Sequence, residues 1–381
     1  MVEKQKRLVA LDILRGITIA GMITVNNPGS WSHIYAPLRH APWNGCTPTD
    51  LVFPFFVFVM GVAMYISWSK KDFRLTWRAA GKLLYRGLML ILIGWIVGCY
   101  GITLRTLTGD GSWADVGYKI VHNLRFLGVF PRLGLVSLFA GFLLLLFKPK
   151  RMPWVIAVLL IAYCVLIAVT GSFELNDSNI LARVDVAVLG DSHMYHKDGI
   201  AFDPEGLLST IPCIAHCLIG TMAGMLIMRT GDKWQKVNNL FILGSIMLMS
   251  GFLLDYAFPI NKSMWSASYV LVTCGLASLL LALLVWIIDI KGKRRWSVFF
   301  ESFGANPLFI YVLSALIVIT ISNIRFGFHG EQYSVWSFWY KVCMQPLFGD
   351  KGGSLACALS LVGLMWCIGY PLYRKRIYIK I

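Results

Sequence analysis

Ten apolar segments, separated by shorter polar stretches, repeat along this chain of 381 residues. Each is close to the roughly 20 residues that an α-helix needs to cross a bilayer. They span residues 10–28, 50–68, 83–101, 128–147, 153–171, 207–228, 237–258, 265–289, 305–322 and 353–371. The pattern predicts an all-α fold, a polytopic membrane helix bundle of about ten transmembrane helices.

The composition agrees with a membrane protein, since 57% of the residues are hydrophobic, 14% are charged and the mean hydropathy is +0.67. The polar breaks are short, so we expect one transmembrane domain over residues 1–381 rather than several soluble domains. The first apolar run contains Asp12 and Arg15 and lacks a small-residue cleavage site. We interpret it as an uncleaved membrane helix and not as a signal peptide.

The net charge of +16 is unevenly distributed, because Lys and Arg gather in every second polar break. These basic breaks include Lys4, Lys6 and Arg7, the stretch 70–86, and Arg374, Lys375, Arg376 and Lys380. The other breaks hold most of the acidic residues. The positive-inside rule then predicts that both termini are cytoplasmic and that segment 29–49 lies on the outer side. Topology and attraction to anionic lipid account for the charge, which excludes nucleic acid as a partner.

Cysteine usage gives no disulfide framework, since seven of the nine Cys lie in apolar segments, where Cys packs as a small apolar residue. Cys213, His216 and Cys217 share one helix face, and we interpret them as packing residues rather than metal ligands. The long break 102–127 includes an amphipathic stretch, WADVGYKIVHNLRFLG, which is typical of a surface or re-entrant helix.

One polar segment, carrying His40, Trp43, Asn44 and Asp50, leads directly into the second apolar run. Ionisable groups where a membrane helix meets water are costly and often functional. Imidazole is also the side chain suited to proton transfer near neutral pH. His40 is therefore the first catalytic candidate, although a His here can also cap a helix. Asp50 can cap the second helix or orient the imidazole, as a carboxylate does in a catalytic triad.

Four further polar side chains lie near or within the apolar runs. Asn26 can meet His40 across the connecting loop and support an oxyanion, or form an interhelical hydrogen bond. Asp12 and Arg15 are three residues apart and favour a local ion pair. Arg132 can snorkel to the interface, or bind a phosphate or carbonyl group inside the bundle.

The residues in the predicted outer breaks also have two interpretations. Aromatic residues such as Trp43 can stack on sugar rings, but they are more typical of an interfacial belt. Asp191 and His193, in the sequence GDSHMYH, lie in the longest outer loop, where a solvated loop is the default and metal or sugar contact the alternative.

The segment RHAPWNGCTPTDLVFPFFVFVMG, from Arg39 to Gly61, closely resembles the core of the heparan-α-glucosaminide N-acetyltransferases, a family of transmembrane acetyltransferases. The resemblance continues in order through LDILRG, PRLG, LGDSHMYHKDGIAFDPEGLLSTI, INKSMWSASYV and the closing YRKRIYIKI. The chain departs from the lysosomal enzyme at Ser314 and Ala315, where that enzyme has a His-Glu pair. It also lacks the luminal N-terminal domain and one helix, which suggests a bacterial inner-membrane protein.

The resemblance implies that acetyl passes from cytosolic acetyl-CoA to the amine of a terminal glucosamine or a related amino sugar on the outer side. It implies that His40, Asp50 and Asn26 are catalytic, and it makes a homodimer plausible. We further assign acetyl-CoA binding to Arg132, Arg15 and Arg78, acceptor binding to Trp43, Asn44, Asp191 and His193, and no metal.

Two chemical routes stay open from the sequence. His40 is either a general base on the acceptor amine or a nucleophile that carries the acetyl group. Three other functions compete with N-acetyl transfer: O-acetyl transfer to a cell-envelope glycan, small-solute transport with a His/Asp proton relay, and a structural scaffold.

Overall fold

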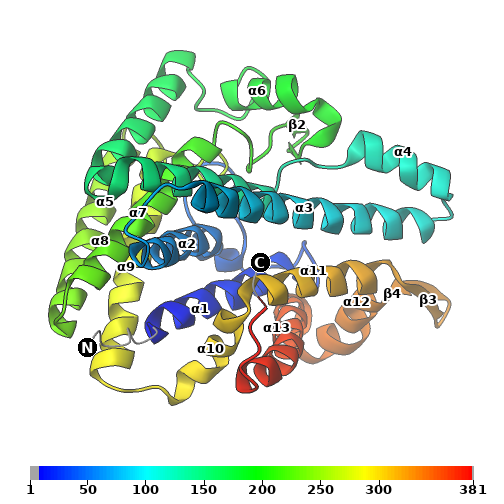
Figure 1. Ribbon diagram of the computed structural model, residues 1–381. Helices are drawn as coiled ribbons and strands as arrows, with labels where there is room; N and C mark the ends of the chain where they lie inside the picture. Colours follow the sequence, from blue (N-terminus) through cyan, green and yellow to red (C-terminus); the bar gives the residue numbers. More distant parts are fainter. Residues whose placement is uncertain (1–7, 380–381) are drawn as a thin grey trace.

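A computed structural model describes residues 8–379 of the chain, so the basic residues Lys4, Lys6, Arg7 and Lys380 lie outside the described residues. The fold is an all-α helix bundle with two small β-hairpins (Figure 1). The helices are α1 Val9–Asn26, α2 Val52–Ser69, α3 Trp77–Leu107, α4 Trp113–Asn123, α5 Val129–Thr170, α6 Ile180–Leu189, α7 Thr210–Arg229, α8 Lys233–Asp255, α9 Ala267–Val285, α10 Val298–Ala305, α11 Pro307–Asn323, α12 Val335–Phe338 and α13 Gln345–Arg374.

Eight helices in residues 8–379 are long and apolar enough to cross a membrane, or nine if the bent pair α10–α11 is one span. All ten predicted apolar segments are helical, which confirms the polytopic helical bundle. Large apolar side chains stay exposed on the bundle, such as Trp154 at 76% and Val169 at 81%. Such exposure fits a surface in contact with lipid.

The difference between ten predicted segments and eight spans has two sources: segment 305–322, which lies in the bent pair α10–α11, and the two segments that form α5. Segments 128–147 and 153–171 form this one 42-residue element, which breaks only at Lys148, where φ is 61° and ψ is 159°. Lys148 precedes Pro149, and the residue before a proline is disfavoured in the helical region. The two predicted helices therefore exist, but a single residue joins them in place of the five-residue loop that the sequence predicted.

The core lies where α2 and α7 cross. A Cβ atom on Gly61 of α2 would collide with the carbonyl of Cys217, and one on Gly220 of α7 with the carbonyl of Phe58. Small residues of this kind let membrane helices approach closely, so that van der Waals packing holds them together. The packing fixes α2, the helix that follows Asp50, rigidly in the bundle.

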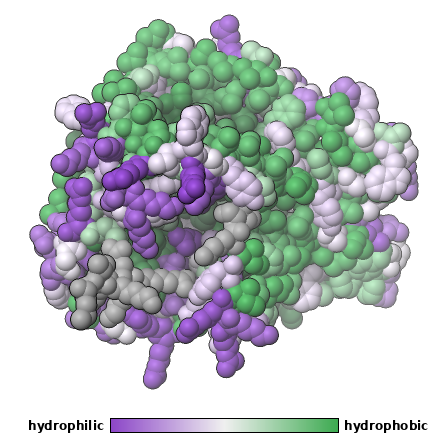
Figure 2. Space-filling model, in the orientation of Figure 1, coloured by the Kyte–Doolittle hydropathy of each residue, from purple (hydrophilic) through white to green (hydrophobic). Residues whose placement is uncertain are grey.

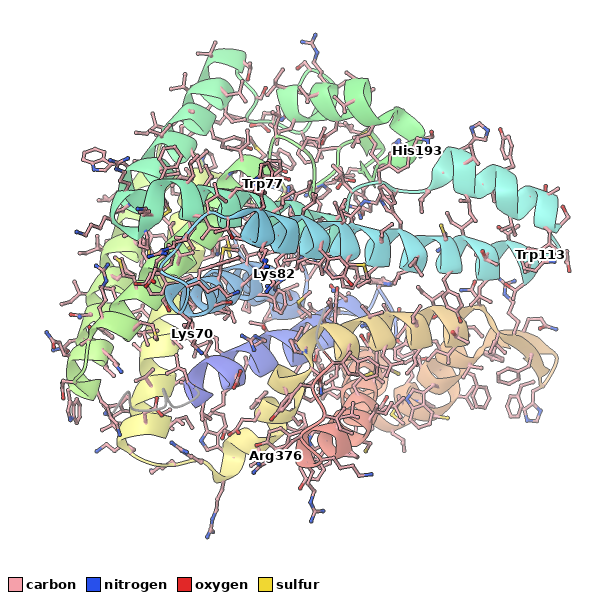
Figure 3. All side chains as sticks on the ribbon, viewed as in Figure 1. Lys70, Trp77, Lys82, Trp113, His193 and Arg376 are labelled. Carbon is pink, nitrogen blue, oxygen red and sulfur yellow. The ribbon has the colours of Figure 1, made fainter. Side chains whose placement is uncertain are left out.

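Helices α4 and α12 and the hairpin of β3 and β4 lie at the right of the view, away from Lys70 (Figures 1 and 3). The amphipathic stretch in 102–127 forms α4, as predicted, and only Val116 of that helix is buried. The hairpins pair β1 His196–Lys197 with β2 Ile200–Ala201, and β3 Arg325–Phe328 with β4 Glu331–Ser334. In Figure 3, Lys70 and Arg376 lie toward the left of the view and Trp113 at the far right, an arrangement that fits the predicted alternation of basic and acidic breaks.

Candidate active site

His40 and Asp50 meet in the polar segment that precedes α2. The Nδ1 atom of His40 lies 2.6 Å from Oδ1 of Asp50. The His40 side chain is 44% exposed, whereas that of Asp50 is fully buried. Because an ionised carboxylate only accepts hydrogen bonds, Nδ1 carries the proton, and in the neutral ring Nε2 has a free lone pair. The prediction that Asp50 orients His40 matches this geometry.

Local sequence places Asp50 in that position. Two short 3₁₀ turns, η1 Ala36–Leu38 and η2 Pro48–Leu51, flank the loop. In η2, Pro48 stands at the first helical position, and Thr47 and Asp50 form a capping box. The predicted alternatives for Asp50 are therefore both realised, since one oxygen takes part in the cap and the other faces the imidazole.

Hydrogen bonds hold the Asp50 carboxylate rigidly. Its Oδ2 atom accepts from the backbone N–H groups of Ala41 at 3.1 Å and Thr47 at 3.0 Å, and from the Thr47 hydroxyl at 3.0 Å. The backbone carbonyl of Asp50 accepts a bond from the Tyr269 hydroxyl at 2.6 Å. Three donors converge on one oxygen, which leaves Oδ1 to orient His40.

A third charged group, Lys262, completes the cluster and was missed by the sequence reasoning. Its Nζ atom lies 3.4 Å from Asp50 Oδ1, and 3.0 and 3.4 Å from Nδ1 and Nε2 of His40. One atom cannot lie along the in-plane lone pairs of both ring nitrogens, so the ammonium lies against the face of the imidazole. A signal was available, since Lys262 is the lone basic residue in a short outer break, 259–264.

The segment 259–266 reaches the site by pairing with the loop between His40 and Asp50. Gly45 N–H donates to the Ile260 carbonyl at 2.6 Å, and the Asn261 amide donates to Asn44 Oδ1 at 3.2 Å. Burial and the Asp50 carboxylate raise the pKa of nearby Cys46 to about 12. The Cys46 thiol therefore stays protonated near neutral pH and is a poor nucleophile.

The predicted meeting of Asn26 with His40 is not found in the described residues. The Asn26 amide instead donates to the Tyr311 hydroxyl on α11, at 3.1 Å. This bond is the interhelical alternative, which arises because α1 packs beside α11 in the bundle.

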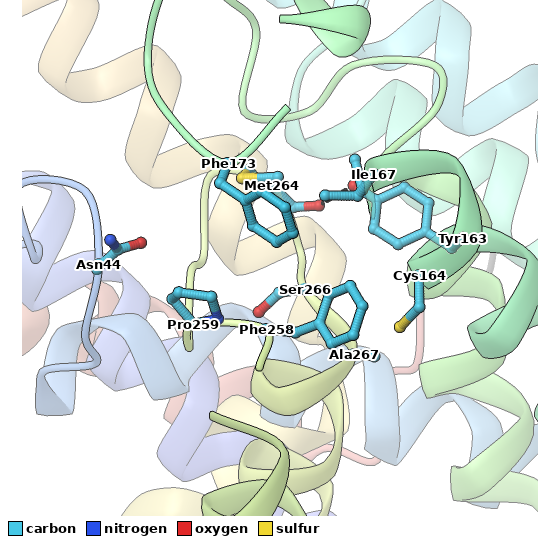
Figure 4. A pocket seen from close by; sticks show the side chains of 10 residues that line it. All are labelled: Asn44, Tyr163, Cys164, Ile167, Phe173, Phe258, Pro259, Met264, Ser266 and Ala267. Atoms are coloured by element: carbon cyan, nitrogen blue, oxygen red, sulfur yellow. Dashed lines mark hydrogen bonds between the residues drawn. The ribbon is translucent and has the colours of Figure 1, made fainter. Parts of the chain in front are cut away.

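The predicted acceptor residues Trp43 and Asn44 support the loop. Trp43 Nε1–H donates to the Phe173 carbonyl at 2.8 Å, and its ring packs edge-on against Phe202. Asn44 borders an aromatic recess with Phe173 and Phe258 (Figure 4), whose volume of about 10 Å³ is close to that of one water molecule. The recess is therefore too small for a sugar.

Asp191 and His193 lie in the turn η3, Asp191–His193. The ring of His193 stacks on Phe126 at 4.2 Å, and its Nδ1 lies 2.8 Å from the Leu124 carbonyl. Asp191 is exposed and pairs with His196 at 3.3 Å. His193 thus connects the long outer loop to the segment between α4 and α5.

Arg132 does not snorkel, because it is fully buried. Its guanidinium donates to the Gly206 carbonyl at 3.1 Å and to the Ser209 hydroxyl, and lies over the Trp265 ring at 5.1 Å. Of the two predicted alternatives, the structure bears out a carbonyl contact inside the bundle, because the loop before α7 folds over the end of α5 and provides acceptors there. The assignment of Arg132 to acetyl-CoA binding stays a prediction.

Arg15 and Arg86 border a cavity of about 350 Å³ between α1, α2, α3, α5 and α11. Arg15 forms the predicted ion pair with Asp12 at 3.1 Å. Arg86 has no carboxylate within ion-pair distance among residues 8–379. Arg86 also lines an open groove with Arg78 and Lys82, and Figure 2 shows hydrophilic residues gathered around a hollow on this face.

The cavity and the His40 cluster share α2. Phe56, the first α2 residue that lines the cavity, lies six residues after Asp50, about 9 Å along a helix. The cavity and the His40 cluster therefore lie at different points along one helix.

Comparison with known proteins finds two curated relatives, and no protein-family model matches the chain. Heparan-alpha-glucosaminide N-acetyltransferase of Mus musculus is 28% identical in an alignment that covers 98% of this chain and 60% of the relative. The Homo sapiens protein of the same name is also 28% identical, in an alignment that covers 80% of this chain and 52% of the relative. The chain thus spans between half and two thirds of the relatives' length.

Proposed function

We propose that the chain is a member of the transmembrane acetyltransferase family of heparan-α-glucosaminide N-acetyltransferase, since it is 28% identical to two proteins of that name, and that it transfers acetyl from acetyl-CoA to an amino sugar across the membrane. The observation that carries the proposal is the 2.6 Å contact between His40 Nδ1 and buried Asp50. It leaves Nε2 of a half-exposed imidazole free to accept a proton or an acetyl group.

In the general-base route, His40 Nε2 takes a proton from the acceptor amine while the amine nitrogen attacks the thioester carbonyl. The C–N bond forms, the C–S bond breaks, and the departing CoA thiolate takes the proton from the imidazolium. In the nucleophilic route, Nε2 itself attacks the thioester carbonyl, the C–S bond breaks and the CoA thiolate leaves. The amine then attacks the acetyl-imidazolium, the C–N bond forms as the bond from acetyl to Nε2 breaks, and the thiolate takes the amine proton. Asp50 holds the same tautomer in both routes.

The cavity between Arg15 and Arg86 is the proposed path for the pantetheine arm of acetyl-CoA. Arg86, which lacks a carboxylate partner among the described residues, and neighbouring Arg78 are suited to the CoA phosphates. The apolar α2 side chains Phe56, Val59 and Met60 fit the uncharged arm. The predicted orientation puts this entrance in the cytosol and His40 outside.

Transfer of label from radiolabelled acetyl-CoA to glucosamine tests the proposal, with N-acetylglucosamine as the matched acceptor that lacks a free amine. We expect labelled product only with the free amine. Transfer to both sugars would indicate O-acetylation and overturn the amine as acceptor. Failure of the folded protein to bind acetyl-CoA would overturn the acetyltransferase itself and favour the transporter.

A further inference from the structure

Lys262 brings an ammonium group against His40 and Asp50 from a segment more than 200 residues away in the chain. Its side chain is only 20% exposed. Burial lowers the pKa of Lys262, and the Asp50 carboxylate opposes that shift. The ammonium nitrogen lies within 3.4 Å of both His40 and Asp50, so its charge acts directly on both side chains.

Lys262 and His40 share the Asp50 carboxylate. Asp50 is fully buried and bears one negative charge, which the ammonium of Lys262 at 3.4 Å already balances. A proton on Nε2 would add a second positive charge against the ammonium, which Coulomb repulsion disfavours. Without Lys262, the imidazole would be the nearest group able to balance Asp50 and would bind a proton more readily.

The other titratable groups that act on this cluster are Cys46, Lys197, Glu205 and Tyr269. Each has a partner of its own or stays uncharged. Lys197 donates to Ser263 at 2.7 Å, and Glu205 pairs with Arg125 at 2.6 Å. None of the four forms a hydrogen bond or ion pair with His40 in the part of the chain that the structure describes.

We propose that Lys262 is a positioning residue that keeps His40 a neutral imidazole, with its proton on Nδ1 and with Nε2 open to the acceptor. The catalytic meaning of this inference rests on the proposed acetyl transfer. The ammonium acts through the imidazole, and it offsets the tendency of Asp50 to convert His40 into an inactive imidazolium. Asp50 thus orients the imidazole, while Nε2 of His40 keeps its free lone pair.

Modification of His40 by diethyl pyrocarbonate tests the inference without any need for acetyl transfer. This reagent reacts with a histidine side chain only through an unprotonated ring nitrogen. The rate is followed between about pH 5 and 8 by mass spectrometry of the peptide that contains His40. The variants are Lys262→Gln, which keeps a hydrogen-bond donor, Lys262→Met and Lys262→Arg. Lys197→Gln is the matched control, since it removes a nearby charge that does not contact the imidazole.

We expect the midpoint, the pH at which the modification rate of His40 is half-maximal, to rise by about one unit in Lys262→Gln and Lys262→Met. Lys262→Arg should keep the wild-type midpoint, and Lys197→Gln should shift it far less. An unchanged midpoint in Lys262→Gln, or an equal shift in Lys197→Gln, would overturn the inference. Where transfer is measured, the acid limb of kcat/KM should shift equally with KM for acetyl-CoA unchanged. Absent transfer alongside a shifted midpoint would refute only the proposed function.

Discussion

Replacing Asp50 by Asn tests the role of the carboxylate, because the structure dictates how an amide must fit. Three donors, from Ala41 N–H and from the N–H and O–H of Thr47, converge on Oδ2. Only the carbonyl oxygen of the Asn amide can accept them. The amide NH₂ must then face His40 Nδ1, which has to become an acceptor, so the ring proton moves to Nε2.

This change removes a hydrogen bond to a charged group, worth about 1.5–3 kcal/mol, and also blocks the atom that takes the acceptor proton. Both effects together resemble the replacement of the orienting carboxylate in a catalytic triad. We expect kcat/KM in Asp50→Asn to fall about 10³- to 10⁴-fold, equivalent to about 4–5.5 kcal/mol. Affinity for acetyl-CoA should change little, since the proposed entrance lies along α2 beyond Phe56.

The assay is acetyl transfer in detergent, with acetyl-CoA binding measured separately on the same preparations. Thr47→Val is the matched control, because it removes one hydroxyl donor to Oδ2 and keeps the carboxylate beside His40. The control should lose no more than about tenfold. A folded Asp50→Asn protein with the wild-type rate would refute the reasoning and reduce Asp50 to a helix cap.

The remaining predictions concern pH, packing and the cavity. Burial raises the pKa of Asp185 to about 6, so the stability that protonation supplies is complete below about pH 4 and is lost as the pH rises through 6. Asp185→Asn should flatten that pH dependence of the apparent Tm, and an unchanged slope would contradict it. Gly220→Ala should destabilise the protein by more than about 2 kcal/mol, because its Cβ meets the Phe58 carbonyl, whereas Gly363→Ala on α13 has open space and should be tolerated. Arg86→Gln should raise KM for acetyl-CoA roughly tenfold with kcat nearly unchanged, and an unaltered KM would remove Arg86 from the binding path.

Much of the helical architecture was predictable because a membrane forces every spanning segment to satisfy its backbone hydrogen bonds internally. Apolar length alone therefore located the helices. The join at Lys148 was misplaced because a basic, proline-containing stretch looks like a loop, whereas only the residue before Pro149 leaves the helical region. The two hairpins turn at Asp198-Gly199 and His329-Gly330, where each residue has positive φ. Those dipeptides were available signals for tight turns.

The site was predictable only as far as it is local. His40 and Asp50 are ten residues apart in one polar loop, so their meeting followed from the sequence. Lys262 and the Tyr311 partner of Asn26 come from other helices or loops, and their contacts depend on how the bundle packs. The two alternatives for Arg132 stayed open for the same reason, since its acceptors at Gly206 and Ser209 lie on a distant loop. Periodicity does not encode such pairings.

The central claim is that acetyl crosses the membrane through His40, and sealed proteoliposomes test it most directly. Glucosamine is enclosed, radiolabelled acetyl-CoA is added outside, and the wild-type protein is compared with His40→Ala in vesicles sorted for the orientation with the basic loops outward. We expect labelled N-acetylglucosamine inside the wild-type vesicles and none with His40→Ala. Equal product with His40→Ala, or product formed only when both substrates are on one side, would contradict the account.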